Sequence, residues 1–318
     1  MKFLSILLYI LLSALVLIYS YEINENDTVE RNVAAYLYNA EKAVYENDFL
    51  LCINHLQQAL QLQSNHPIAN QVIGSAYLKL DMIDKAIHHI KLALDLLQWN
   101  DPSLCSNYIE AIRRTGDLNL ASEIGYKTLL YHNNSDNVSL ILYNLAVVEE
   151  ERKEYNKAYE LYKRLIDTST TIPLLIYYKH LIDLLLNDIY EYTILDYYAE
   201  QAIQYYPNEQ ELYVSYGLSL HYQNRLQDSL SVYQRSYALN PKNYKTVTHI
   251  AAVYQTLGQA EEALYYYQLA LPFQATDSGV RNNYGTLYSA VYLYTSVFLY
   301  TLHTTYMTYL AHHIIYCI

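Results

Sequence analysis

Apolar residues recur at intervals of three and four along most of the chain, which is the spacing of one face of an α-helix. The stretch HIAAVYQTLGQAEEALYYYQLAL, residues 249–271, shows this spacing on both sides of Gly258. Its smallest other side chains lie at Ala251, Ala263 and Ala270. Two helices approach closely only where bulky side chains are missing. The stretch therefore predicts two amphipathic helices that are joined at Gly258 and pack through alanines.

The same pattern returns along the chain. A small residue is followed by a second one twelve positions later and by an aromatic or aliphatic residue four further on, as in Gly217, Ser229 and Tyr233. Seven units are predicted, and they span 33–66, 67–101, 102–138, 139–175, 176–209, 210–243 and 244–277. The start of an eighth unit is expected at 278–288, with Gly285 as its small residue.

Two features depart from this regularity. In the fifth unit, Lys179 and Asp183 fall where a bulky and a small residue are expected, so its register is open by a residue or more. Extra residues follow the third and fourth units, in YHNNSDNVS and TSTTIP. Insertions of this kind are expected in exposed turns.

One helix pair cannot bury its apolar face alone, so neighbouring pairs are expected to stack. Over about residues 33–276 the repeat resembles that of tetratricopeptide repeat (TPR) proteins. The resemblance implies an all-α fold, a right-handed superhelical solenoid of helix-turn-helix units. It also implies a protein-protein interaction scaffold in which the first helices line a concave groove that holds a peptide or protein partner.

The sixth position of each first helix is the candidate binding row. Its residues are Tyr38, Val72, Asn107, Asn144, Leu181, Ser215, His249 and Asn283. Asparagine there can hydrogen-bond a peptide backbone, and this gives a weaker resemblance to the TPR arm of O-linked N-acetylglucosamine transferases. The residues predicted to contact a partner are Asn107, Asn144, Ser215, His249 and Asn283. The basic clamp of chaperone-tail binders is missing, because Leu37 and Gln71 occupy its lysine position.

Charge narrows the choice of partner. The formal net charge is −12, and an acidic chain repels phosphate backbones, so nucleic acid is not an expected ligand. An acidic groove favours basic or neutral peptides. The chain has 40 tyrosines against 4 phenylalanines. They either fill helix-packing positions or form a tyrosine-lined binding surface, and the sequence leaves both interpretations open.

No motif for catalysis or for phosphate binding occurs in the sequence. The three cysteines Cys52, Cys105 and Cys317 are too few for a disulfide framework or a zinc site, and the first two are expected to be buried. The pair His88 and His89 lacks a third ligand. The acidic run 149–151 is expected to be a solvated helix end. The sequence therefore predicts no enzyme, no cofactor and no metal.

Residues 1–20 combine Lys2 with an uncharged apolar run, and an acidic linker follows at 21–32. This pattern predicts a signal peptide or an uncleaved signal anchor. Either one places the rest of the chain in the secretory pathway lumen or outside the cell, with membrane anchoring through the N-terminal segment in the second case. Three N-glycosylation sequons, at Asn26, Asn133 and Asn137, agree with this location.

Residues 289–318 form a low-complexity tail without charged residues. It is expected to be a segment outside the solenoid, a C-terminal membrane segment or a cap helix. The loss of the repeat pattern also leaves an alternative function open. In that alternative the chain is the truncated N-terminal targeting arm of a larger enzyme, a protein glycosyltransferase whose catalytic domain follows.

Overall fold

The computed structural model of the protein describes residues 28–132, 137–169, 171–273, 282–289, 291 and 305. Two compact units divide the chain, Met1–Ser169 and Thr170–Ile318, called here the N-terminal and C-terminal units. The helices of the N-terminal unit are α2 (Thr28–Tyr45), α3 (Phe49–Leu62), α4 (Pro67–Lys79), α5 (Ile83–Leu96), α6 (Pro102–Arg114), α7 (Leu118–His132), α8 (Val138–Glu151) and α9 (Tyr155–Asp167).

The C-terminal unit continues the succession of helices. Its elements are α10 (Leu175–Leu184), the π-helix η1 (Leu185–Ile189), α11 (Tyr192–Tyr205), α12 (Gln210–Tyr222), α13 (Leu226–Leu239), α14 (Tyr244–Thr256), α15 (Ala260–Ala270) and the 3-10 turn η2 (Leu271–Phe273). A further helical segment covers 282–289.

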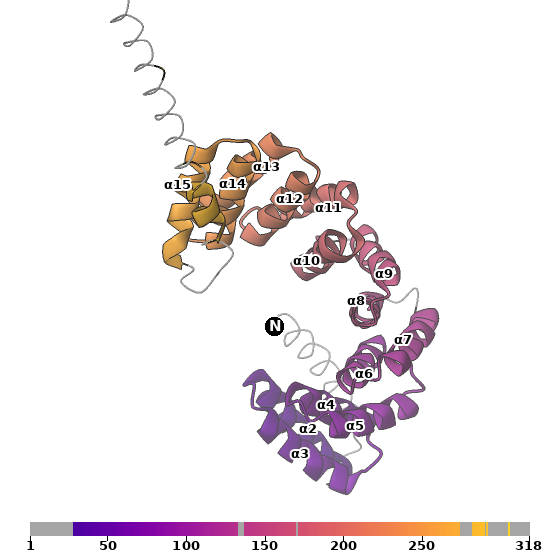
Figure 1. Ribbon diagram of the computed structural model, residues 1–318. Coiled ribbons are helices and arrows are strands. Elements are labelled where there is room, and N and C mark those ends of the chain that lie inside the picture. The colour runs from indigo at the N-terminus through magenta and orange to yellow at the C-terminus, as the bar shows by residue number, and fades with distance from the viewer. Residues whose placement is uncertain are drawn as a thin grey trace, which may run out of the picture. The chain divides into compact units, whose positions relative to one another are not determined.

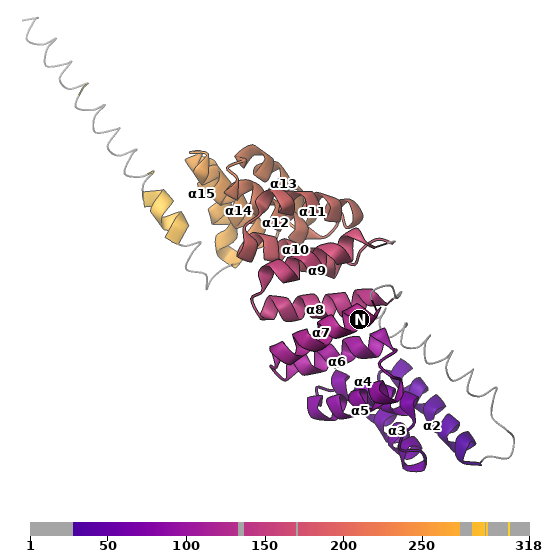
Figure 2. The same cartoon turned by 90° about the vertical axis from the view of Figure 1, so that its right-hand side faces the viewer.

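Within each unit the helices pack as a stack of antiparallel pairs (Figures 1 and 2). In the N-terminal unit α2 packs on α3, α3 on α4, and so on to α9, and α6 also contacts the first helices α4 and α8. In the C-terminal unit α12 contacts α11, α13 and the first helices α10 and α14. The predicted all-α solenoid of helix-turn-helix pairs is thus confirmed.

Small residues lie where the paired helices touch. A Cβ added to Gly74 would lie 2.7 Å from Cγ1 of Ile90, and one added to Gly217 would lie 2.5 Å from Cε1 of Tyr233. Ala251 and Ala263 are fully buried in one cluster. These contacts confirm that the repeated small residues mark the close approach of helices.

Two glycines differ from the expectation. Gly125 on α7 was not singled out by the pattern, but its added Cβ would lie 2.6 Å from Cδ1 of Leu145 on α8. At Gly285, which was assigned to a close-packing position, no described atom lies within 4 Å of the added Cβ, and the second helix expected for this unit falls outside the described residues. The segment around it packs instead through Tyr284 and Leu287 onto the cluster of α14 and α15.

Every turn inside a helix pair contains one left-handed residue two positions before the second helix. These residues are Asn47, Asp81, Gly116, Lys153, Tyr190, Asn224 and Gly258, with φ between 59° and 88°. Only two of the seven are glycine, although the left-handed region costs other residues about 1–2 kcal/mol. The turn geometry is therefore imposed by packing of the pairs.

Replacing Lys153 with glycine is expected to raise the free energy of unfolding by about 0.5–1 kcal/mol, because Lys153 is exposed and has a φ of 62°. Urea unfolding followed by circular dichroism measures the change. The matched control Lys157→Gly lies inside α9 and should lower stability by about 1 kcal/mol. A loss of stability in Lys153→Gly would contradict the assignment of strain to this turn.

The fifth helix pair differs from the register that the sequence predicts for the fifth unit. The π-helix η1 accommodates one additional residue between α10 and the turn. As a result Ile182 is buried in α10, and Asp183, which the sequence placed at the small-residue position, is exposed. Lys179 is partly exposed, and its ammonium group lies 2.6 Å from a carboxylate oxygen of Glu211.

The acidic run at 149–151 is not a solvated helix end. Glu149 is fully buried and accepts hydrogen bonds from Ser122 and Arg152. Glu150 accepts a hydrogen bond from the buried Tyr162 at 2.7 Å. Only Glu151 is exposed. The helical spacing turns consecutive carboxylates toward different neighbours, and the charge pattern alone did not reveal this.

Several predictions fall outside the described residues. They concern the N-terminal segment 1–20, the sequons at Asn26 and Asn133, Cys317 and nearly all of the tail 289–318. Among the helices that the structure does describe, none combines the length and the apolar character needed to span a bilayer.

Candidate functional site

The candidate row along the first helices is not uniform in exposure. Tyr38 and Asn283 are exposed, whereas Val72 and Leu181 are buried. The remaining members are partly exposed, namely Asn107, Asn144, Ser215 and His249. The first four members lie in the N-terminal unit and the last four in the C-terminal unit, and each group is described by itself.

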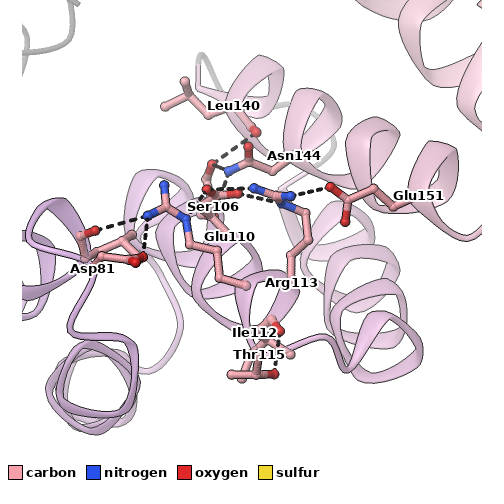
Figure 3. Close-up of polar contacts among 11 residues, drawn as sticks. Asp81, Ser106, Glu110, Ile112, Arg113, Thr115, Leu140, Asn144 and Glu151 are labelled. Atoms are coloured by element: carbon pink, nitrogen blue, oxygen red, sulfur yellow. Dashed lines mark hydrogen bonds and ion pairs between the residues drawn. The ribbon is translucent and has the colours of Figure 1, made fainter.

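In the N-terminal unit the two asparagines tie neighbouring first helices together. Asn107 on α6 donates from Nδ2 to Oγ of Ser75 on α4 at 3.2 Å. Asn144 on α8 donates from Nδ2 to the carbonyl oxygen and Oγ of Ser106 on α6, at 2.9 and 2.8 Å (Figure 3). Ser106 in turn donates to the carbonyl oxygen of Leu140. The serines therefore hold both amides in fixed orientations.

A network of charges centred on α6 lies near the amide of Asn144 (Figure 3). Glu110 receives hydrogen bonds from Arg113 and Arg114, and Arg113 also pairs with Glu151. Burial opposes ionisation of Glu110, but the hydrogen bonds from the two arginines outweigh it and lower the pKa of this carboxyl. Arg114 further pairs with Asp81 at 3.4 Å. Because the arginines are neutralised, this surface is not an anion site.

In the C-terminal unit the row contains a packed histidine. The ring of His249 on α14 stacks on Tyr233 with a centroid distance of 5.4 Å. Burial, with smaller effects from His221 and Lys245, lowers the pKa of His249 to about 4. His249 therefore serves packing as a neutral side chain, and Ser215 is the partly exposed polar member of the row on α12.

The lowered pKa predicts acid sensitivity. An unfolded histidine binds a proton near pH 6.5, and folded His249 resists protonation until about pH 4, so stability should fall as the pH drops through this window. The variant His249→Phe keeps an aromatic ring but cannot titrate. We expect it to lose about 2 kcal/mol less than the wild type between pH 7 and pH 5 in urea unfolding. Equal losses in both proteins would contradict this role of His249.

Tyrosine fills many of the packing positions. Tyr162, Tyr178, Tyr233 and Tyr267 are among the largest fully buried side chains. Most of these hydroxyls meet a polar partner, as when Tyr267 donates to Oε1 of Gln255 at 2.8 Å. This supports the packing interpretation of the tyrosine excess. Exposed tyrosines such as Tyr222 also occur, so a tyrosine-lined surface is not thereby excluded.

The buried thiols offer no reactive group. Cys52 and Cys105 are fully buried as expected, and burial raises the pKa of each thiol to about 12. Where side chains are described, no three histidine, cysteine or carboxylate groups gather as metal ligands. The hydrogen bonds and ion pairs described above join neighbouring helices.

Neither the comparison with family models nor that with curated proteins gave a match to this sequence. Solved structures are similar in fold. YrrB, described as a TPR protein with an unusual peptide-binding site, has 15% identity and a TM-score of 0.53, covering 61% of this chain and 96% of that one. The C-terminal part of a TPR repeat-containing protein from Cytophaga hutchinsonii has 12% identity and a TM-score of 0.65, covering 78% and 98%.

A third similar structure is a TPR protein from Parabacteroides merdae, with 10% identity and a TM-score of 0.52, covering 81% of this chain and 99% of that one. At these identities the likeness shows the fold alone. The fold of the described chain is that of tetratricopeptide repeat proteins, as the sequence predicts.

Proposed function

We propose that the protein is an interaction scaffold that binds a peptide or protein segment along its first helices. The observation that carries this proposal is the pair of oriented amides at Asn107 and Asn144. Each amide is partly exposed and is held through Nδ2 by a serine on the preceding first helix. The side-chain carbonyl of each asparagine is then positioned to accept a hydrogen bond from a peptide backbone.

The row extends through Ser215, His249 and Asn283 in the C-terminal unit, which stay predicted contacts. Asn283 is exposed and Ser215 partly so, whereas His249 contributes packing. YrrB is described as having a peptide-binding site, and a TPR fold that presents polar groups along its first helices suits the same class of ligand. Protein or peptide partners are accordingly proposed, with no nucleic acid because of the acidic charge.

Affinity capture with the full chain tests this function. The double variant Asn107→Ala, Asn144→Ala should lose partners that the wild type retains. The control Asn39→Ala removes an exposed asparagine from α2 outside the row. The variant Ser75→Ala keeps the amide of Asn107 but loosens it, so an intermediate loss is expected. Equal recovery of every partner by the double variant and by the wild type would refute binding through these amides.

We also propose a location on the lumenal side of the secretory pathway. It rests on the apolar segment 1–20 and on the sequons, of which Asn137 is described and lies partly exposed directly before α8. If the location is right, treatment with an endoglycosidase shifts the wild-type chain on a gel. A chain in which Asn26, Asn133 and Asn137 are all replaced by glutamine should show no shift.

The alternative is a targeting arm of a larger enzyme, a protein glycosyltransferase. The asparagines at 107, 144 and 283 favour it, because they partly match the asparagine row in the TPR arm of O-linked N-acetylglucosamine transferases. Sequencing the transcript beyond the codon for Tyr288 distinguishes the two functions. An alternative exon that encodes a catalytic domain would support the arm.

A further inference from the structure

Two unusual backbone features coincide between α10 and α11. The π-helix η1 precedes the turn, and Tyr190 then adopts the left-handed conformation with a φ of 63°. The equivalent left-handed positions of the other pairs hold glycine, asparagine, aspartate or lysine, so among these seven turns Tyr190 is the one aromatic residue. A bulky residue there costs about 1–2 kcal/mol. Such strain and such π-helical insertions are concentrated at functional sites.

The strained turn presents a tyrosine cluster, formed by Tyr190, Tyr192 and Tyr222. Tyr190 is 62% exposed and Tyr222 is 59% exposed. The rings of Tyr192 and Tyr222 have centroids 5.4 Å apart and planes inclined by 37°. Burial, followed by the neighbouring hydroxyls of Tyr222 and Tyr190, raises the pKa of Tyr192. Tyr192 and Tyr222 therefore form a ring pair, and Tyr190 lies two residues before Tyr192, in the turn that leads into α11.

The charges around the cluster select the ligand. Asp188 and Glu191 flank Tyr190 and are both exposed. The nearby cation Arg225 is held by Asp228 and Asp196, at 2.9 and 3.0 Å. Aromatic faces attract cations, and guanidinium groups stack on them more often than ammonium groups. Exposed carboxylates on an acidic chain add a longer-range attraction for positive charge.

We propose that this tyrosine cluster is a docking site for an arginine side chain in a basic segment of a partner protein. The guanidinium lies against the rings of Tyr190 and Tyr222 while Asp188 and Glu191 balance its charge. This site is separate from the first-helix row at Asn107 and Asn144. It gives the scaffold a second contact, in the C-terminal unit, with a defined preference for basic chains.

Calorimetric titration of the full chain with an Arg-Gly-Arg-Gly-Arg peptide tests the site. The same peptide with citrulline in place of arginine keeps the shape but has no side-chain charge, and it should not bind. Tyr190→Gly removes one ring and also relieves backbone strain, so the fold should be stabilised while binding weakens roughly two- to fivefold. Tyr222→Leu should weaken binding to a similar degree.

Tyr265→Leu is the matched control, because Tyr265 is 58% exposed and follows Glu261 and Glu262 on α15. It should bind the arginine peptide as the wild type does. The proposal is overturned if the wild type does not bind this peptide or binds the citrulline peptide equally well. It is also overturned if Tyr190→Gly and Tyr222→Leu leave the affinity unchanged. None of these variants alters the first-helix row, so the test of this site and the test of the first-helix row have independent outcomes.

Discussion

Replacing Gly217 with leucine is expected to lower the free energy of unfolding by about 3 kcal/mol. The position on α12 faces the ring of Tyr233 on α13, with Cε1, Cδ1 and Cζ all within 2.7 Å of an added Cβ. Tyr233 cannot yield, because it is fully buried and its ring stacks on His249. A larger side chain must therefore separate α12 from α13. Urea unfolding monitored by far-ultraviolet circular dichroism measures the loss.

The contrast between two glycines isolates the packing effect. Gly217→Ala introduces a steric conflict that should outweigh the gain of about 1 kcal/mol in helix propensity. In Gly285→Ala no atom of the described residues lies within 4 Å of the added methyl group, so stability should be unchanged or slightly higher. Both glycines hold the same place in the sequence pattern. Equal effects of the two alanine substitutions would mean that close packing at Gly217 is not what makes glycine necessary there.

The helix pairs and their close contacts could be predicted from the sequence, because their cause is local. Gly74, Gly217 and Ala251 hold the same place in their repeat units, and the close packing of helices depends on small side chains at that place. Gly285 shows where this reasoning ends. A small residue creates a contact only if a partner helix is present, and the described residues place none over Gly285.

The polar arrangements could not be predicted, because each joins residues far apart in the sequence. The pattern placed Asn107 and Asn144 in a common row, but their bonds to Ser75 and Ser106 depend on how successive first helices meet. The π-helix η1 likewise shifts the register by one residue without a sequence signal beyond an irregular unit. The candidate site was therefore predicted as a set of positions, whereas its hydrogen bonding required the structure.

Glu149 is another residue whose contacts could not be predicted from the sequence, and its loss is expected to have the largest effect on stability. Its side chain is fully buried between α7 and α8, where it accepts hydrogen bonds from Oγ of Ser122 at 2.5 Å and from Arg152 at 2.8 Å. Arg152 also donates to Oγ of Ser122 at 3.0 Å, which closes a three-membered network. A buried carboxylate is tolerated only where such partners replace water. The network therefore fixes how the third helix pair meets the fourth.

Glu149→Ala is expected to destabilise the protein by about 3–4 kcal/mol, because Arg152 and Ser122 lose their shared acceptor inside the α7–α8 contact. Glu151→Ala is the matched control two residues away. Its carboxylate is exposed and pairs with Arg113, so a loss of at most about 1 kcal/mol is expected. Unfolding midpoints in urea compare the two variants. If Glu149→Ala were as mild as Glu151→Ala, water would have to reach the network, and Glu149 would not be the residue that joins these two pairs.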